Sequence, residues 1–353
     1  MTVSDGDFKS SGKDVQQRSD GSVQKQPVLY SLSLGQQQFS RRVADRQQPR
    51  WWNEIRLASK LSFIRDRLVE CYFFAAGITP QPQLTKARIG LTKVSILVSI
   101  IDDIYDVYGS PDELHLFTNV VKRWDLNGVK QLQNYMKLCF LALYNTINEL
   151  GYYNIKEQGV NPISLLAEKW ADMCEAFLVE ATWNYKKVTP PLKVYLENAW
   201  VSISGVVILS HAYFLVTQNI TNGELGGLQN NHDLLRWSSM IFRLCNDLGT
   251  SKTELMRGET ANSILCRMQE SGHSENNSRN YVKGLLDEAW RNLLNEKDLA
   301  GKNSEFERLF IEATINLARI SQFSYWYGDV HGVPDNRSKN LVLSFIIEPL
   351  AFE

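Results

Sequence analysis

"PISLLAEKWADMCEAFLVEATWNY", residues 162–185, decides the fold class, because its apolar side chains recur three and four positions apart, as on one side of a helix. The same spacing returns in residues 51–75, 278–296 and 305–323, and Gly- and Pro-containing segments separate the runs. No alternating strand pattern lasts long enough to build a sheet, and no repeat is visible. We therefore predict an all-α fold of ten or more helices, forming one domain over residues 28–353. Residues 1–27 are poor in apolar side chains and are predicted to be a disordered polar tail.

Composition sets limits on function. The chain has 353 residues, of which 44% are hydrophobic, so it can bury a large core. A net charge of −1 gives no reason to expect nucleic acid or an anionic membrane as a partner. The five cysteines show no CxxC spacing, and we expect buried thiols in a reducing compartment. The N-terminus lacks the apolar segment of a secretory signal and is too acidic for a good transit peptide, so the expected location is the cytoplasm.

Residues 198–223 carry no Asp, Glu, Lys or Arg and are long enough to cross a bilayer. The stretch also contains several serines and His211, and it ends in polar residues. These features favour a buried central helix over a membrane span.

The stretch "SIIDDIYDVYG", residues 99–109, places aspartates at the end of an apolar run. Asp102 and Asp106 are four positions apart, which puts both carboxylates on one face of a helix. Two such carboxylates repel each other unless a cation lies between them, and Mg²⁺ prefers one or two carboxylates together with water and phosphate oxygens. The alternative is a solvated acidic helix end.

A second group of oxygen donors lies in "RLCNDLGTSKTELMRGE", residues 243–259. Asn246, Thr250 and Glu254 follow one another at four-residue steps, so they form one stripe on a helix. An amide, a hydroxyl and a carboxylate make a weak site for a hard cation, which an anionic ligand would complete. The alternative is the polar face of an amphipathic helix.

Arginines and aromatic residues complete the pattern. Arg65, Arg67 and Arg243 are candidates for forked hydrogen bonds to phosphate, although a single arginine is more often a solvated charge. The aromatic cluster at residues 323–327 could stabilise a cation without offering a nucleophile, or simply pack in the core. Together, these features indicate a substrate with a diphosphate head and an oily tail. Its carbon–oxygen bond would ionise beside metal ions and arginines, inside a dry cavity.

On these residues, the chain resembles the class I catalytic domain of plant terpene synthases, most closely the monoterpene branch. "IDDIYDVYG" matches the family's DDxxD motif, and "NDLGTSKTE" matches the second metal motif (N/D)Dxx(S/T)xxxE. "RDR", 35 residues before Asp102, is similar to the family's RxR motif, and "YWYGDVHG" resembles its active-site cap. The resemblance runs from about residue 28 to residue 353 and implies a class I terpenoid synthase helical bundle around an apolar cavity.

The resemblance also implies roles for individual residues. Asp102 and Asp106 would hold two Mg²⁺ ions, with Asp103 in support, and a third ion would be held by Asn246, Thr250 and Glu254. Mn²⁺ could substitute for Mg²⁺. Arg65 and Arg243 would bind the diphosphate, with Asp102, Asp106 and Asn246 contacting substrate through the metals. Gly205 falls where these enzymes break a helix and turn backbone carbonyls toward the cation, and Tyr327 and Asp329 would belong to the closing lid.

Two departures from the family are visible. Its larger N-terminal helical domain and its plastid transit peptide have no counterpart in this chain, so either a truncated gene product or an unusual splice form is expected. Phe74 also stands where the family often has Trp.

Three further positions bear on the product. Asn262 and Phe242 are similar to the branch that makes ocimene and isoprene, whereas Ser95 stands where isoprene synthase carries a pocket-narrowing Phe. The expected activity is conversion of geranyl diphosphate to an acyclic monoterpene olefin of the β-ocimene or myrcene type, by a monomer or weak dimer.

Three alternatives stay open at this point. The chain could be a sesquiterpene synthase that accepts farnesyl diphosphate. It could be a prenyltransferase, although its second metal motif is of the Asn/Thr/Glu type and not Asp-rich. It could also be a weak or inactive fragment that lacks a partner domain.

Overall fold

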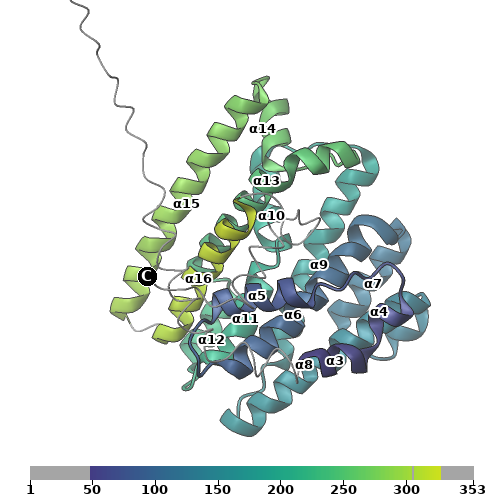
Figure 1. The fold of residues 1–353 in the computed structure, drawn as a ribbon, viewed down its shortest axis with the longest axis vertical. Coiled ribbons are helices and arrows are strands. Elements are labelled where there is room, and N and C mark those ends of the chain that lie inside the picture. The colour runs from purple at the N-terminus through teal and green to yellow at the C-terminus, as the bar shows by residue number, and fades with distance from the viewer. Residues whose placement is uncertain (1–47, 304–305, 327–353) are drawn as a thin grey trace, which may run out of the picture.

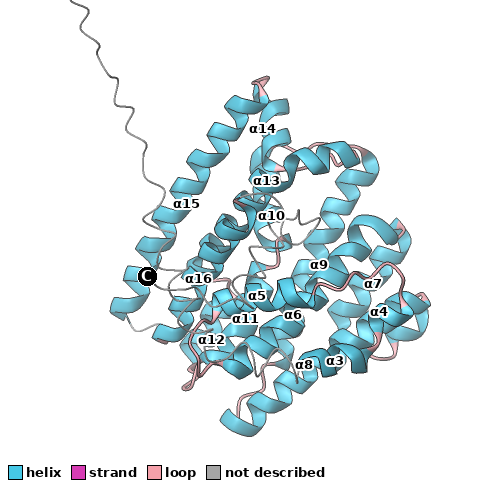
Figure 2. Cartoon of the chain, in the orientation of Figure 1, coloured by secondary structure: helices cyan, strands magenta, loops and turns pink. Residues whose placement is uncertain are grey.

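The structure is a computed structural model that describes residues 48–303 and 306–326, and within these ranges it contains helices and loops but no strand (Figures 1 and 2). The all-α prediction is confirmed. The α-helices are α3 (Gln48–Ile55), α4 (Leu57–Lys60), α5 (Leu68–Ile78), α6 (Thr85–Asp103), α7 (Pro111–Arg123), α8 (Asn134–Gln158), α9 (Ile163–Lys186), α10 (Leu192–Ser202), α11 (Gly205–Val216), α12 (Asn222–Gln229), α13 (Asp233–Arg257), α14 (Ser263–Ser271), α15 (Glu275–Asn303) and α16 (Arg308–Tyr325). A π-helical turn, η1 (Ile104–Tyr108), follows α6, and a 3₁₀ turn, η2 (Gly128–Gln131), follows α7.

Helix α11 is the centre of the bundle. It contacts α6, α9, α13 and α16, and every residue in it except Leu215 is buried. A helix that is apolar on all sides is stable only when other helices surround it. The long amphipathic helices α13, α15 and α16 pack against one another on one side, as Figure 1 shows. The predicted helix at residues 162–185 is α9, which spans Ile163–Lys186.

Most of the uncharged stretch at residues 198–223 lies inside the bundle, but residues 218–223 at its polar end are exposed or only partly buried. The span Leu192–Val216 is long and apolar enough to cross a membrane, but 89% of its most apolar window is buried against other helices. A backbone break at Ser204, whose φ of 69° is left-handed, divides it into α10 and α11. The buried-helix interpretation is confirmed, with two helices in place of one. The five cysteines are also buried and unpaired, as predicted.

Residues 51–75 differ from the single helical run that their spacing suggests. The chain forms α3, leaves the helix at Arg56, whose φ of 52° is left-handed, and resumes as α4 and then α5. Leu57, Leu61 and Ile64 are all buried in the core along this path. Tertiary burial therefore outweighs local helix preference here. The consequence for the site is that Arg65 and Arg67 lie on a loop before α5, and not on a helix.

The helix break does not fall at Gly205 itself. Ser204 carries the left-handed backbone, and Gly205 is the first residue of α11. A Cβ at Gly205 would lie 2.4 Å from Oγ and 3.0 Å from Cα of Ser239 on α13. Glycine is therefore required because α11 and α13 approach each other closely, and the left-handed turn is made by its neighbour.

We expect Gly205→Ala to lower the free energy of unfolding by about 1–3 kcal/mol, the usual cost of overpacking a core. Denaturant unfolding followed by circular dichroism measures this change. Gly284→Ala is the matched control, since a Cβ there meets nothing within 4 Å and Gly284 lies within α15. The control should gain about 0.5–1 kcal/mol from improved helix propensity. Equal effects at the two glycines would contradict the close-packing explanation.

Candidate functional site

One cavity of about 530 Å³ opens between the C-terminal end of α6, η1, α9, the α10–α11 break and α13. Its wall has a polar part and an apolar part. The polar part contains six carboxylates and four arginines, which give a net charge of −2 when all are ionised. They are Asp102, Asp103, Asp106, Glu180, Glu254, Glu259, Arg65, Arg67, Arg243 and Arg257.

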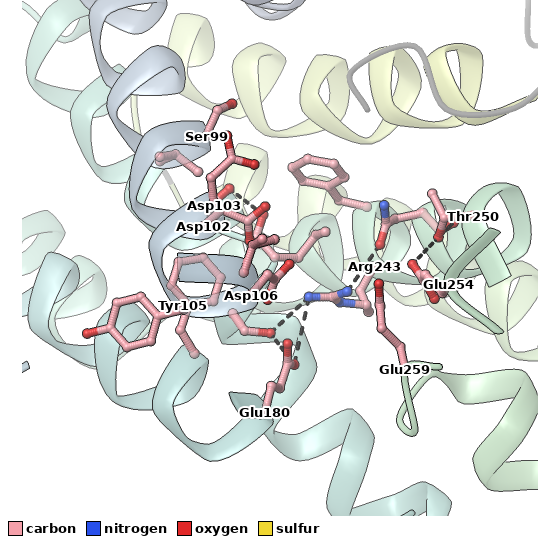
Figure 3. Close-up of a pocket in the computed structure, with 18 of the residues that line it drawn as sticks. Ser99, Asp102, Asp103, Tyr105, Asp106, Glu180, Arg243, Thr250, Glu254 and Glu259 are labelled. Carbon is pink, nitrogen blue, oxygen red and sulfur yellow. Dashed lines mark hydrogen bonds and ion pairs between the residues drawn. The ribbon is translucent and has the colours of Figure 1, made fainter. Parts of the chain in front are cut away.

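The aspartates at residues 102–106 are presented by a helix that changes its winding. Helix α6 ends at Asp103, and the chain continues as a single π turn in which the Gly109 N–H donates to the Ile104 carbonyl at 2.8 Å. Asp102 lies on α6 and Asp106 on the π turn, and both line the cavity (Figure 3). The expected regular α-helical spacing is therefore wrong in detail. The shared orientation toward one cavity is present, and single π turns are frequent at functional sites.

Tyr105 anchors this turn from the other side. Its hydroxyl is hydrogen-bonded to the Thr118 hydroxyl on α7 at 2.7 Å, and its ring lies 5.4 Å from that of Phe177 on α9. The buried tyrosine thus fixes the rotation of the turn that carries Asp106.

Asp103 holds the two arginines of the "RDR" segment. Its carboxylate accepts two hydrogen bonds from the Arg67 guanidinium, at 3.1 and 3.2 Å, and one from Arg65 at 3.5 Å. Arg67 is largely buried, whereas about half of the Arg65 side chain is exposed at the cavity rim. Asp103 therefore orients the two arginines, and its support of the metal-binding aspartates stays a prediction.

The predicted stripe on α13 faces the aspartates across the cavity. Figure 3 shows Thr250 and Glu254 on the side opposite Asp102 and Asp106. The Thr250 hydroxyl donates to the Glu254 carboxylate. Asp247, the residue next to Asn246, is fully buried on another face of the helix. It accepts hydrogen bonds from the Tyr195 hydroxyl and the Ser263 backbone N–H.

Arg243 lies between these two groups, and only 11% of its side chain is exposed. Its Nε donates to the Ala199 carbonyl at 3.1 Å, and Nη2 donates to the Ser202 hydroxyl at 2.9 Å. Its Nη1 donates to Oδ1 of Asn246 at 3.1 Å. The arginine is thus a fixed part of the wall that joins α13 to the end of α10, and not a solvated surface charge.

Two carboxylates compensate the charge of Arg243. Asp247 lies 3.6 Å and Glu180 3.8 Å from its guanidinium nitrogens. Glu180, on α9, also accepts a 2.6 Å hydrogen bond from the Ser202 hydroxyl. Figure 3 shows Arg243 between the Asp-rich turn and the α13 stripe, with Glu180 beside its guanidinium.

The interior of the cavity is mainly apolar. The Phe74 ring lies 5.3 Å from that of Phe242, and the Phe242 ring lies 6.2 Å from that of Tyr325. Val98 and Ile208 extend this surface toward α6 and α11. The polar rim and the aromatic interior thus belong to one space, which suits a molecule with an anionic head and an apolar tail.

Burial and nearby negative charge raise the pKa values of carboxyl groups in the cavity wall. Burial, assisted by Asp103, raises the pKa of Asp102 to about 7, against the opposing effects of Arg67 and Arg243. Burial and the nearby Asp247 raise the pKa of Glu254 to about 8. Asp106 is open to the cavity, but protein surrounds that space. Burial and the Asp102 charge therefore raise the pKa of Asp106 well above its ordinary value.

These observations fit a divalent cation. The donors facing one another are carboxylate, amide and hydroxyl oxygens, which hard cations prefer, and the four arginines of the wall do not fully neutralise its six carboxylates. In the described parts of the chain, no three His, Cys, Asp or Glu side chains are close enough to form a complete site on their own. A cation here would therefore need additional ligands, such as water and the phosphate oxygens of a substrate.

Several residues at the site lie outside the sequence motifs that predicted it. Glu180 lies on α9, which also carries Glu168, Asp172 and Glu175, so nothing in the local sequence distinguishes it as a site residue. Glu259 and the loop residues Thr260 and Ala261 complete the rim. The predicted lid residues Tyr327 and Asp329 lie outside the described residues.

The chain is similar in sequence to known proteins. Residues 53–292 match the model of the terpene synthase family, metal binding domain. A tricyclene synthase of Medicago truncatula is 51% identical over 302 residues, which cover 85% of this chain and 52% of that protein. An (E)-beta-ocimene synthase of Matricaria chamomilla is 47% identical over 300 residues, covering 85% and 50%. The chain thus spans about half the length of the curated relatives it matches.

A solved structure shares the fold. The isoprene synthase of grey poplar, in complex with three Mg²⁺ ions and dimethylallyl-S-thiolodiphosphate, superposes with a TM-score of 0.80 at 46% identity. The match covers 92% of this chain and 60% of that one. The three proteins are named for different products, so similarity alone does not select a product for this chain.

Proposed function

The chain belongs to the terpene synthase family, metal binding domain, and from its cavity we propose that it is a Mg²⁺-dependent lyase that converts geranyl diphosphate to an acyclic monoterpene olefin. The observation that carries this proposal is the shared cavity, in which oxygen donors from α6–η1 and α13 face each other above an aromatic interior. In the reaction, the bond between carbon 1 and the diphosphate oxygen breaks, and diphosphate leaves with the electron pair. The allylic cation then loses a proton to give the olefin.

Different residues of this chain would act on the diphosphate head and on the hydrocarbon tail of the substrate. Asp102 and Asp106 on one side, and Asn246, Thr250 and Glu254 on the other, would hold the metal ions, and Glu180 offers a further carboxylate. When bound, Mg²⁺ neutralises the charge that develops on the leaving diphosphate. Arg243 is held in place before substrate arrives, and such preorganised charge costs little rearrangement during reaction. Arg65, at the exposed rim, is placed to meet the diphosphate as it enters.

The aromatic interior would protect the cation. Phe74, Phe242 and Tyr325 present ring faces and edges but no strong nucleophile, and aromatic faces attract cations. Exclusion of water from this part of the cavity favours loss of a proton over capture of the cation by water.

The size of the cavity supports a ten-carbon substrate. Ser95 is small and buried on the cavity wall, and it leaves space that a larger side chain would occupy. Farnesyl diphosphate is the longer alternative substrate. The ocimene-type product is supported by resemblance at Phe242 and Asn262 together with the room at Ser95.

The direct test is to incubate the purified protein with geranyl diphosphate and Mg²⁺ and to analyse the headspace by gas chromatography–mass spectrometry. An acyclic C10 olefin above the level of an Asp102→Ala control supports the proposal. Formation only of C5 or C15 products would reassign the substrate. Absence of any volatile product, together with absence of thermal protection by Mg²⁺ and diphosphate, would support the inactive-fragment alternative.

We expect the apparent affinity for Mg²⁺ to rise as the pH increases from 6 to 8.5. The raised pKa values of Asp102, about 7, and of Glu254, about 8, mean that protons compete with the metal at the lower end of this range. The stability that these protons confer on the metal-free protein is full at low pH. It is lost as the pH rises through the two folded-state pKa values.

Thermal-shift titrations with Mg²⁺ and a fixed concentration of inorganic diphosphate, repeated across this pH range, measure the effect. Diphosphate also changes its own ionisation, and so its Mg²⁺ binding, over this pH range. A parallel Mg²⁺ titration of diphosphate with a metal indicator, without protein, supplies the correction. A Mg²⁺ requirement that does not change with pH after this correction would contradict the prediction.

A further inference from the structure

The turn between α13 and α14 is attached to α13 at two points, of which one, Glu254, lines the cavity. The Ser263 backbone N–H donates to the buried Asp247 carboxylate at 2.9 Å, and the Asn262 side-chain amide donates to Oε2 of Glu254 at 3.0 Å. Asn262 is 1% exposed and Glu254 is 9% exposed. The turn therefore contacts the metal-binding helix directly.

Both the amide nitrogen and the carbonyl oxygen of the Asn262 side chain form hydrogen bonds. Its Oδ1 accepts hydrogen bonds from the backbone N–H groups of Ile264 and Leu265, at 3.1 and 2.9 Å, and so caps the first turn of α14. With Oδ1 committed to the helix, the amide nitrogen is necessarily the end that faces Glu254. The cap thus determines which group the asparagine presents to the carboxylate.

The Glu254 carboxylate receives one neutral donor on each oxygen. Thr250 donates to Oε1 and Asn262 donates to Oε2. Each carboxylate oxygen has two lone pairs, so one hydrogen bond on each leaves capacity for a cation. Because both donors are uncharged, they restrict the carboxylate without cancelling the negative charge that a metal requires.

We propose that Asn262 is a positioning residue that holds the Glu254 carboxylate for metal binding and couples it to the start of α14. This inference rests on the proposed function, since it concerns the metal site of that reaction. Residues that orient a metal ligand through a hydrogen bond change metal affinity when they are replaced, without touching the metal themselves.

The test is Asn262→Ser in the full chain, because serine keeps an N-cap oxygen but is too short to reach Glu254. Thermal-shift titration with Mg²⁺, at fixed inorganic diphosphate, gives the Mg²⁺ concentration for half-maximal protection. We expect this concentration to rise about 10-fold or more, with little change in the melting temperature of the ligand-free protein. If the serine variant does not fold, Asn262→Thr is measured in its place, because threonine can also cap the helix.

Two controls separate positioning from general damage. Thr221→Ala removes the N-cap of α12, a helix whose residues do not line this cavity, and should lower the melting temperature without changing the Mg²⁺ dependence. In a Glu254→Ala background, Asn262→Ser should add no further shift, because the asparagine acts through that carboxylate.

The outcomes are distinguishable. An unchanged Mg²⁺ dependence in Asn262→Ser, or equal shifts with and without Glu254, overturns the positioning role while leaving the proposed function intact. Wild-type protein that is not protected by Mg²⁺ and diphosphate at any concentration overturns both.

Discussion

Asp102→Asn is expected to lower olefin formation by at least about 100-fold and, at the same time, to leave the metal-free protein as stable as the wild type or more stable. The two effects have one cause. Asp102 is partly buried beside Asp103, and this environment raises its pKa to about 7 because the charged form is disfavoured. Asparagine removes that unfavourable charge together with the oxygen ligand that the metal requires.

Steady-state assays with geranyl diphosphate and melting temperatures in the presence of a chelator measure the two effects. The control is Asp287→Asn, an exposed aspartate on α15 outside the cavity, which should change neither quantity appreciably. A variant that loses both activity and metal-free stability would show that Asp102 is a structural residue. Full activity would remove it from the metal site.

Arg243→Met is expected to have the largest effect on stability, a loss of about 3–5 kcal/mol, because removing one partner of a buried ion pair leaves the other charge uncompensated. Glu180 and Asp247 both depend on this guanidinium, and Asp247 is fully buried. The variant should also lose activity, since a cation that would meet the diphosphate is gone.

Chemical denaturation gives the loss of stability, and the product assay is performed at a temperature where the variant is folded. Arg236→Met provides a matched control on the same helix. Arg236 forms a more exposed pair with Glu197, and such pairs contribute about 0–1 kcal/mol. Similar losses of stability in the two arginine variants would show that the buried ion pairs of Arg243 with Glu180 and Asp247 do not stabilise the fold more than an exposed pair does. Arg243→Lys should recover charge but not the three-way hydrogen bonding of the guanidinium.

These two predictions concern opposite sides of one cavity. The Asp102 side of the cavity carries carboxylates whose charged form is disfavoured by burial, whereas the Arg243 guanidinium is hydrogen-bonded within the protein alone. A site with this asymmetry keeps Arg243 in place for an anion, but its net negative charge opposes anion binding until metal cations are bound. Binding of diphosphate and metal would therefore be mutually dependent, as expected when the substrate supplies ligands to the metal.

The helical class and the composition of the site could be predicted from the sequence because both depend on local spacing. Apolar residues three and four apart on residues 162–185 define a helix wherever that segment lies, and Asn246, Thr250 and Glu254 must share a stripe once α13 forms. The chemistry of oxygen donors likewise follows from residue type. The buried state of most of residues 198–223 also followed, since the serines, His211 and the polar end of this uncharged run favoured a packed helix over a membrane span.

Only the tertiary structure decided how these parts meet. The loop that brings Arg65 and Arg67 to Asp103 and the hydrogen bonds of Arg243 to Ser202 and Ala199 involve residues far apart in the chain, and the π turn after Asp103 is held by the contact of Tyr105 with Thr118 on α7. Glu180 and Asn262 belong to the site because α9 and the α13–α14 turn pack against it, and no spacing rule links them to the motifs. Local sequence thus determined which helices form and which chemical groups they carry. Packing determined which of those groups are buried, paired and aimed at one cavity, because burial and ion pairing depend on neighbours in space.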